Sequence, residues 1–242
     1  MFMNFDGSMP MSISEIKNRI RQHIQIIDDP DDVADLLGIS AETLRKQFRT
    51  EEHDRLWIFI LKEKVKHFLE DLPPYPTGGN GQFPNAQQVI DAYRSVLPGP
   101  DRTWFRDVRE MIALINDNPF DFNLNVNWIR NELNIPPNMY TQKFYFFTRM
   151  HVTEYIRWHR LVMAKYLLSH SSLKIGGIAL LVGYNSLSAF SKAFAQNVGS
   201  SPKVYRATHL AHPSPSSAQP DLVQKTKAVA AESESLQRKS LG

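Results

Sequence analysis

Apolar residues recur at helical spacing along most of the chain. Ser12, with Glu15 three positions later, is typical of a helix start. Isoleucines then follow every three or four positions, the period of an amphipathic helix: Ile16, Ile20, Ile24 and Ile27. Further helices are expected up to residue 71, over about 85–97 and across 103–209. No run alternates Val, Ile or Thr with polar residues between turns, so the predicted fold class is all-α.

Composition divides these helices into parts. Residues 72–84 hold too much Pro and Gly to continue a helix and are predicted to be a linker. Residues 1–11 and 210–242 lack periodicity, and we expect both to be disordered. The sequence thus predicts a helical N-terminal domain over 12–100 and a second domain over 103–209.

The charge is unevenly distributed. The net charge of +3 combines −4 over residues 1–104 with +6 over 105–210 and +1 beyond, which indicates a polyanion-binding region in the second half. The chain has no Cys, which excludes disulfides and thiol chemistry. Its longest apolar runs are about six residues, far short of the roughly 18–20 that cross a membrane, and its start lacks a signal-peptide pattern. We expect a cytoplasmic protein without a membrane partner.

The segment 175–194 is typical of a helix-turn-helix. Gly183 can adopt the left-handed conformation that ends a short helix, and Ser186 is a good N-cap for the next. In that second helix one sector should pack inward: Phe190, Ala193, Phe194 and Asn197. The opposite sector carries Ser188, Ser191, Lys192 and Ala195. These small polar side chains and one cation fit a major groove, although a plain solvated surface is the alternative interpretation.

A second, less regular unit lies upstream. Ile129–Leu133 and Pro136–Phe147 form its predicted helices. Its inward residues are Tyr140, Phe144 and Phe147, and its outer face carries Asn138, Thr141, Gln142 and Tyr145. Asn and Gln can bond adenine bidentately. The helix predicted over 153–168 is about 24 Å long and could hold two DNA-reading helices about one turn of DNA apart.

Residues 105–208 resemble the DNA-binding domain of the AraC/XylS family of bacterial transcription regulators. The resemblance rests on Arg160-Leu161, Ala164-Lys165, Leu167-Leu168, Ile178-Ala179, Val182-Gly183-Tyr184, 190–194 (FSKAF) and 199–206 (GSSPKVYR). It implies a nucleoid-associated regulator, an activator by expectation, that binds double-stranded DNA and contacts RNA polymerase. It implies base-facing roles for Asn138, Thr141, Gln142, Leu187, Ser188, Ser191 and Lys192. Pro202 would start a last helix whose free backbone N–H groups can hold a phosphate, with Ser201 and Lys203 as DNA-binding residues.

The chain departs from the family pattern in two places. In the first unit, Arg130, Pro136 and Arg149 replace the usual Ala, Ser and Gly, so this reader could dock differently. In the N-terminal half, helices take the place of the β-rich cupin sensor that many relatives carry.

Residues 33–48 resemble a third helix-turn-helix. They can be laid over 129–144, with Gly38 over Asn134, either as a duplication or as a common helix pattern. The outward face would be Glu42, Arg45, Lys46 and Arg49, a possible third DNA contact. Because this region is acidic, packing or homodimerisation is the favoured interpretation.

Other functions find less support. The chain shows no metal-ligand set, cofactor motif or catalytic arrangement, so no metal, cofactor or enzyme activity is expected. An enzyme fused to a DNA-binding domain is the least favoured interpretation. The alternative to a DNA-binding regulator is a helical interaction or dimerisation regulator whose DNA-binding faces have decayed.

Overall fold

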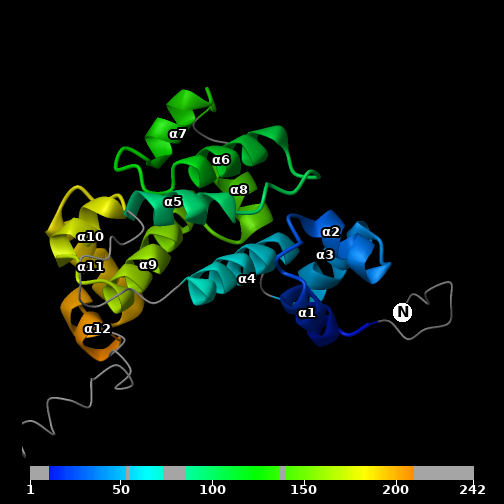
Figure 1. Cartoon of the computed structure of the whole chain (residues 1–242). Coiled ribbons are helices and arrows are strands. Elements are labelled where there is room, and N and C mark those ends of the chain that lie inside the picture. Colours follow the sequence, from blue (N-terminus) through cyan, green and yellow to red (C-terminus); the bar gives the residue numbers. More distant parts are fainter. Residues whose placement is uncertain (1–10, 53–54, 73–85, 137–139, 210–242) are drawn as a thin grey trace, which may run out of the picture. The chain divides into compact units, whose positions relative to one another are not determined.

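The computed structural model describes residues 11–52, 55–72, 86–136 and 140–209 (Figure 1). Within these ranges the regular secondary structure is entirely helical, which confirms the all-α prediction. The segments predicted to be disordered, nearly all of the linker 72–84 and Asn138 lie outside the described residues.

Twelve α-helices lie in the described ranges. They are α1 Ile13–Gln22, α2 Pro30–Leu37, α3 Ala41–Glu51, α4 Leu56–Asp71, α5 Ala86–Ser95, α6 Arg106–Asp117, α7 Val126–Glu132, α8 Tyr140–Thr148, α9 Val152–His170, α10 Ile175–Leu181, α11 Leu187–Val198 and α12 Pro202–His209. None of the helices in the described part is both long and apolar enough to cross a membrane.

Side-chain caps define several of the helix starts. The Ser12 hydroxyl accepts a hydrogen bond from the Glu15 amide at 3.2 Å, as the sequence predicts. Asp29 caps α2, and Asp32 reaches back to the Asp29 amide, which completes a capping box. These carboxylates accept amide hydrogens that the first helical turn leaves without partners, and they also interact favourably with the positive end of the helix.

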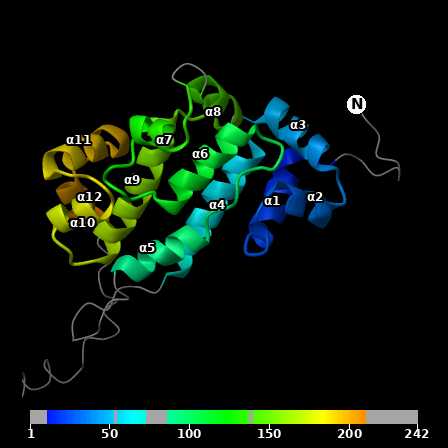
Figure 2. The same cartoon turned by 90° about the horizontal axis from the view of Figure 1, so that it is seen from above.

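Two apolar cores meet at α4. Leu56, Phe59 and Ile60 belong to a smaller core with α1–α3, whereas Trp57 and Leu61 belong to a larger one with helices from α5 to α11. Figure 2 shows α4 running between α1 and α6. A helix that is apolar all round its first two turns must be buried on every side, and this accounts for the run Leu56–Leu61. The boundary between the cores therefore lies within α4; the domain division at 100–103 stays a prediction.

The larger core contains buried polar groups that are paired with one another. The Tyr93 hydroxyl and His159 Nδ1 share a hydrogen bond of 2.7 Å, and the Tyr155 hydroxyl donates to Asn116 Oδ1 at 2.8 Å. Burying such groups without partners would cost several kcal/mol, so these bonds orient α5, α6 and α9 as well as stabilise them.

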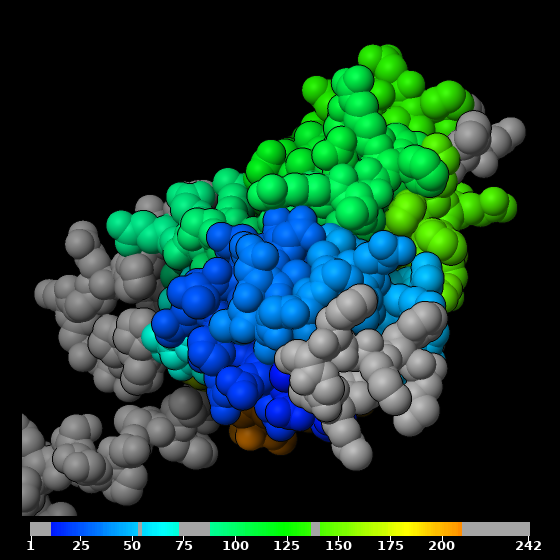
Figure 3. Space-filling model, turned by 90° about the vertical axis from the view of Figure 1, so that its right-hand side faces the viewer, coloured from blue at the N-terminus to red at the C-terminus, as the bar shows by residue number. Residues whose placement is uncertain are grey.

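The smaller core also meets the rest of the structure through a polar contact. Figure 3 shows residues of α1–α3, in blue, beside the green surface that follows residue 100. At this boundary Arg45 on α3 pairs with Asp101 through two hydrogen bonds of 2.7 and 3.0 Å.

Candidate nucleic-acid interface

Helices α10 and α11 form the helix-turn-helix predicted at 175–194. Gly183 has φ +85°, and an added Cβ would lie 2.7 Å from the Phe120 carbonyl oxygen and 3.0 Å from Arg160 Nε. Glycine is thus required both for its conformation and for the close approach of the neighbouring chain. Ser186 caps α11 by accepting from the Ala189 amide at 3.1 Å, and Gly199, at φ +82°, ends the helix. The predicted turn and caps are confirmed.

The two faces of α11 differ in chemistry. Phe190 and Phe194 are fully buried and pack ring against ring, with centroids 5.6 Å apart. Ser188 and Lys192 are exposed, Leu187 is 50% exposed, and Ser191 is half-buried. Within the described residues, the side chains of Ser188 and Lys192 make no hydrogen bond or ion pair, so these groups are available to an external partner.

The inward position predicted for Asn197 is wrong. Asn197 is exposed, and its side-chain amide donates to the Ala193 carbonyl at 2.7 Å. The side chain bonds back to its own helix near the C-terminus, so a residue that periodicity places in the apolar sector is not buried there.

Helices α7 and α8 form the first unit. Asn125 caps α7, and Asn134 takes the left-handed turn position with φ +51°. Of the residues predicted to face inward, Phe144 is fully buried and Phe147 half-buried, while the Tyr140 side chain lies outside the described part. Thr141, Gln142 and Tyr145 are exposed as predicted, and the position of Asn138 stays untested.

Arg149 occupies a left-handed position at the end of α8. Its φ is +57°, and Gly199 holds the corresponding place after α11 with φ +82°. An L-residue other than Asn or Asp is uncommon in this conformation. The first unit thus keeps the backbone path of the second, at the cost of local strain.

Helix α9 connects the two units. It has 19 residues, three more than the 16 predicted, and is therefore about 28 Å long. Figures 1 and 2 show it between the α7–α8 pair and the α10–α11 pair. Its Arg160 donates to the carbonyl oxygens of Asp121 at 2.7 Å and Leu124 at 3.2 Å.

Arg160 is a structural residue to which the sequence pattern assigns no role. Its guanidinium fixes the segment before α7 against α9 and also lies 5.6 Å from the Tyr184 ring centroid. Burial lowers the pKa of this guanidinium, against the opposing effects of Tyr184 and Asp121. Arg160 thereby ties the segment before α7 and the turn of the second helix-turn-helix to the connecting helix. The sequence signal for it was its place in the Arg160-Leu161 pair, on which the family resemblance partly rests.

Helix α12 follows α11 directly and begins at Pro202, as predicted. The Ser201 hydroxyl accepts from the Val204 amide at 3.3 Å, and both Ser201 and Lys203 are exposed. The start of α12 therefore presents backbone amides, a hydroxyl and a cation together, and these are groups that bind phosphate.

Helices α2 and α3 repeat the same local geometry, with Gly38 at φ +64° in the turn. Glu42, Lys46 and Arg49 are exposed on α3, but Arg45 is held by Asp101 and Asp31. This engagement of Arg45 favours packing over DNA contact for the third unit, and we do not retain Arg45 as a DNA-binding residue.

The fold and these exposed faces define a double helix-turn-helix protein. Residues 129–208 match the family model described as a helix-turn-helix domain. The chain also resembles the HTH-type transcriptional activator RhaR of Cronobacter sakazakii, with 41% identity over 59 residues that cover 24% of this chain and 21% of RhaR. The HTH-type transcriptional regulator AlkR of Acinetobacter baylyi is 50% identical over 52 residues, 22% of this chain and 17% of AlkR.

Among solved structures, the C-terminal domain of AraT from Geobacillus stearothermophilus is similar, with 25% identity, a TM-score of 0.43 and coverage of 46% of this chain and 93% of that domain. The chain spans about a fifth of the length of the two curated relatives. The helix-turn-helix segment is thus similar to regulators of the AraC family.

Proposed function

We propose that this protein is a sequence-specific, DNA-binding transcription regulator whose helices α8 and α11 enter adjacent segments of the major groove. The observation that carries the proposal is the two-faced α11, which is anchored by Phe190 and Phe194 and presents Ser188 and Lys192 without partners among the described residues. A helix with small polar side chains and one cation on its free face can approach base edges closely.

The length of α9 supports reading by two helices. At about 28 Å it is comparable to one turn of DNA, about 34 Å, so the readers it connects can address neighbouring major-groove segments on one side of the duplex.

The contacts divide by chemistry. Leu187, Ser188 and Ser191 on α11, with Asn138, Thr141 and Gln142 of the first unit, are proposed to face bases. Lys192 serves bases or phosphate, and Ser201 and Lys203 at the start of α12 hold a backbone phosphate.

The wider role follows from the relatives. RhaR is described as a transcriptional activator, and we extend activation, with RNA polymerase as the partner, to this chain by similarity. The proposal also includes three further points. The protein is a regulator rather than an enzyme, it is located at the nucleoid in the cytoplasm, and it forms a homodimer through α1–α3.

The test begins with genome-wide mapping of binding sites, followed by anisotropy titrations of a mapped duplex. Lys192→Ala is expected to weaken binding about tenfold. If Lys192 contacts phosphate, the slope of log K against log salt concentration should also correspond to about one fewer counterion released. Ser188→Ala should change the preferred base sequence. Lys66→Ala removes the same charge from an exposed position on α4 and should leave binding unchanged. If no sequence-selective complex forms at low salt, the helical interaction regulator with decayed DNA-binding faces replaces this proposal.

A further inference from the structure

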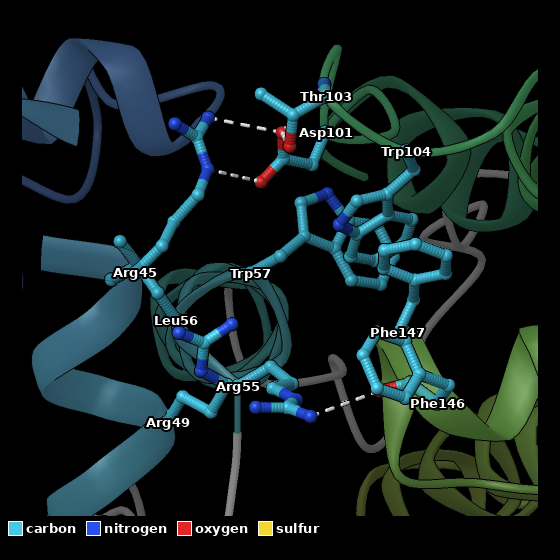
Figure 4. A pocket seen from close by; sticks show the side chains of 10 residues that line it. All are labelled: Arg45, Arg49, Arg55, Leu56, Trp57, Asp101, Thr103, Trp104, Phe146 and Phe147. Atoms are coloured by element: carbon cyan, nitrogen blue, oxygen red, sulfur yellow. Dashed lines mark hydrogen bonds and ion pairs between the residues drawn. The ribbon is translucent and has the colours of Figure 1, made fainter. Parts of the chain in front are cut away.

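A small pocket lies where the start of α4 meets the end of α8. Its volume is about 150 Å³, and Figure 4 shows the side chains that surround it. Arg45 and Arg49 come from α3, Arg55 and Trp57 from the start of α4, Trp104 from the segment before α6, and Phe146 from α8. The pocket thus combines aromatic rings with guanidinium groups.

The aromatic wall is ordered by ring contacts. The Trp57 and Trp104 rings meet edge to face with centroids 5.0 Å apart, and Trp104 packs on Phe147 at 5.4 Å. The Trp57 indole nitrogen donates to the Gly99 carbonyl at 2.6 Å, so this wall does not depend on a ligand for its polar atom. A cavity of about this volume with apolar walls accommodates one six-membered ring.

Among the described residues, the charges around the pocket are unbalanced. Arg45 is neutralised by Asp101, which is 3% exposed at its side chain. Arg49 and Arg55 have no carboxylate partner among the described residues, and Arg55 donates instead to the Phe146 carbonyl at 3.2 Å. Burial, followed by the like charges of Arg149 and Arg49, lowers the pKa of Arg55. An anion bound here would relieve this repulsion.

The N-terminus of α4 adds to the positive potential. Arg55 is the N-cap residue and makes no side-chain cap, and the first turn of α4 contains no acidic residue. A carboxylate near this end would interact favourably both with the helix dipole and with the guanidinium groups.

We propose that this pocket binds a small aromatic carboxylate, with its ring against Trp57 and Trp104 and its carboxylate on Arg49 and Arg55. The aromatic wall favours such a ligand over a DNA phosphate, which would need only the guanidinium groups. A ligand in this place contacts α3, α4 and α8 together, so it links the N-terminal helices to the first helix-turn-helix. Binding itself does not depend on whether α8 contacts DNA.

The test uses the full chain and benzoate, the simplest single-ring carboxylate. Because two of the four tryptophans line the pocket, benzoate should change the tryptophan emission saturably, with a dissociation constant of about 1 mM or below, and calorimetry should agree. Benzamide, which has the ring without the charge, and acetate, which has the charge without the ring, should each bind at least about tenfold more weakly.

Variants locate the site. Arg55→Gln and Arg49→Gln should each weaken benzoate binding about tenfold, since each removes a charge-assisted hydrogen bond. Arg19→Gln, at an exposed position on α1, should not change it. Circular dichroism checks that each variant folds. If Arg55→Gln does not fold, the Arg49→Gln variant decides the test, because Arg49 is exposed. The proposal is overturned by an absence of saturable binding up to about 10 mM, or by binding that survives both substitutions. It is also overturned if both substitutions weaken DNA binding while benzoate does not bind, because the arginines would then serve DNA phosphates.

Discussion

Arg45 and Asp101 form a bidentate ion pair across 56 positions of sequence. The distances are 2.7 Å from Nε to Oδ2 and 3.0 Å from Nη2 to Oδ1. Thr103 also donates to Asp101 through its amide and its hydroxyl, so the carboxylate is fully used. The pair joins α3 to the segment that leads into α6.

Arg45→Met should lower the free energy of unfolding by about 3 kcal/mol, because it leaves the nearly buried Asp101 carboxylate without its cation. Arg49→Met removes a guanidinium from the same helix, at an exposed position, and should change stability by less than about 0.5 kcal/mol. Urea unfolding of both variants measures the difference, and equal losses would contradict a structural role for the pair.

His159 should make stability fall in mild acid. Burial lowers the pKa of His159 from 6.5 to about 3, so below pH 6.5 the unfolded chain binds a proton that the folded chain does not. The stabilisation is complete above about pH 6.5 and is lost as the pH falls towards 3, with about 2 kcal/mol gone by pH 5.

Urea unfolding at pH 7, 6 and 5 tests this dependence. His159→Gln should lower stability at pH 7 and remove the loss of stability that protonation of His159 causes between pH 7 and 5. His67→Gln, on the surface of α4, should keep that loss. A slope that persists unchanged in His159→Gln would assign the acid sensitivity to other groups.

The turn glycines should differ in their tolerance of alanine. At Gly38 an added Cβ meets nothing within 4 Å, so Gly38→Ala should cost only the left-handed backbone penalty of about 1 kcal/mol. At Gly183 the same Cβ would meet the Phe120 carbonyl, and Gly183→Ala should cost about 3 kcal/mol. Chemical denaturation separates the two values, and a smaller loss at Gly183 would mean that the segment around Phe120 moves easily.

Arg149→Gly should stabilise the protein. Glycine adopts φ +57° without the Cβ penalty, and the gain should be about 0.5–1 kcal/mol after the greater chain entropy of glycine is counted. The reciprocal change, Gly199→Ala, should lower stability by about 1 kcal/mol, since φ is +82° there and no atom obstructs the Cβ. Calorimetric melting of both variants measures the opposite shifts. A loss of stability in Arg149→Gly would show that the contact with the Tyr145 ring outweighs the strain.

Local chemistry alone predicts the helices, their caps and the turns between them. Ser12 and Ser186 accept from amides at the expected helix starts, and Gly183 takes the left-handed turn. The same holds for the buried face of α11, because Phe190 and Phe194 are one turn apart. These features depend on residues within a few positions of one another, so the sequence was sufficient for them.

Only the tertiary structure decided which outward side chains meet a distant partner. Helical periodicity places Arg45 and Arg49 on the outer face of α3. Asp101 pairs with Arg45, however, whereas Arg49 lines a pocket together with Arg55. Asn197 lies in the apolar sector of α11 by periodicity but is exposed. The turn angle of a helix sets the direction of a side chain, whereas its surroundings depend on contacts between segments far apart in the chain, and these are set by how the two cores pack around α4.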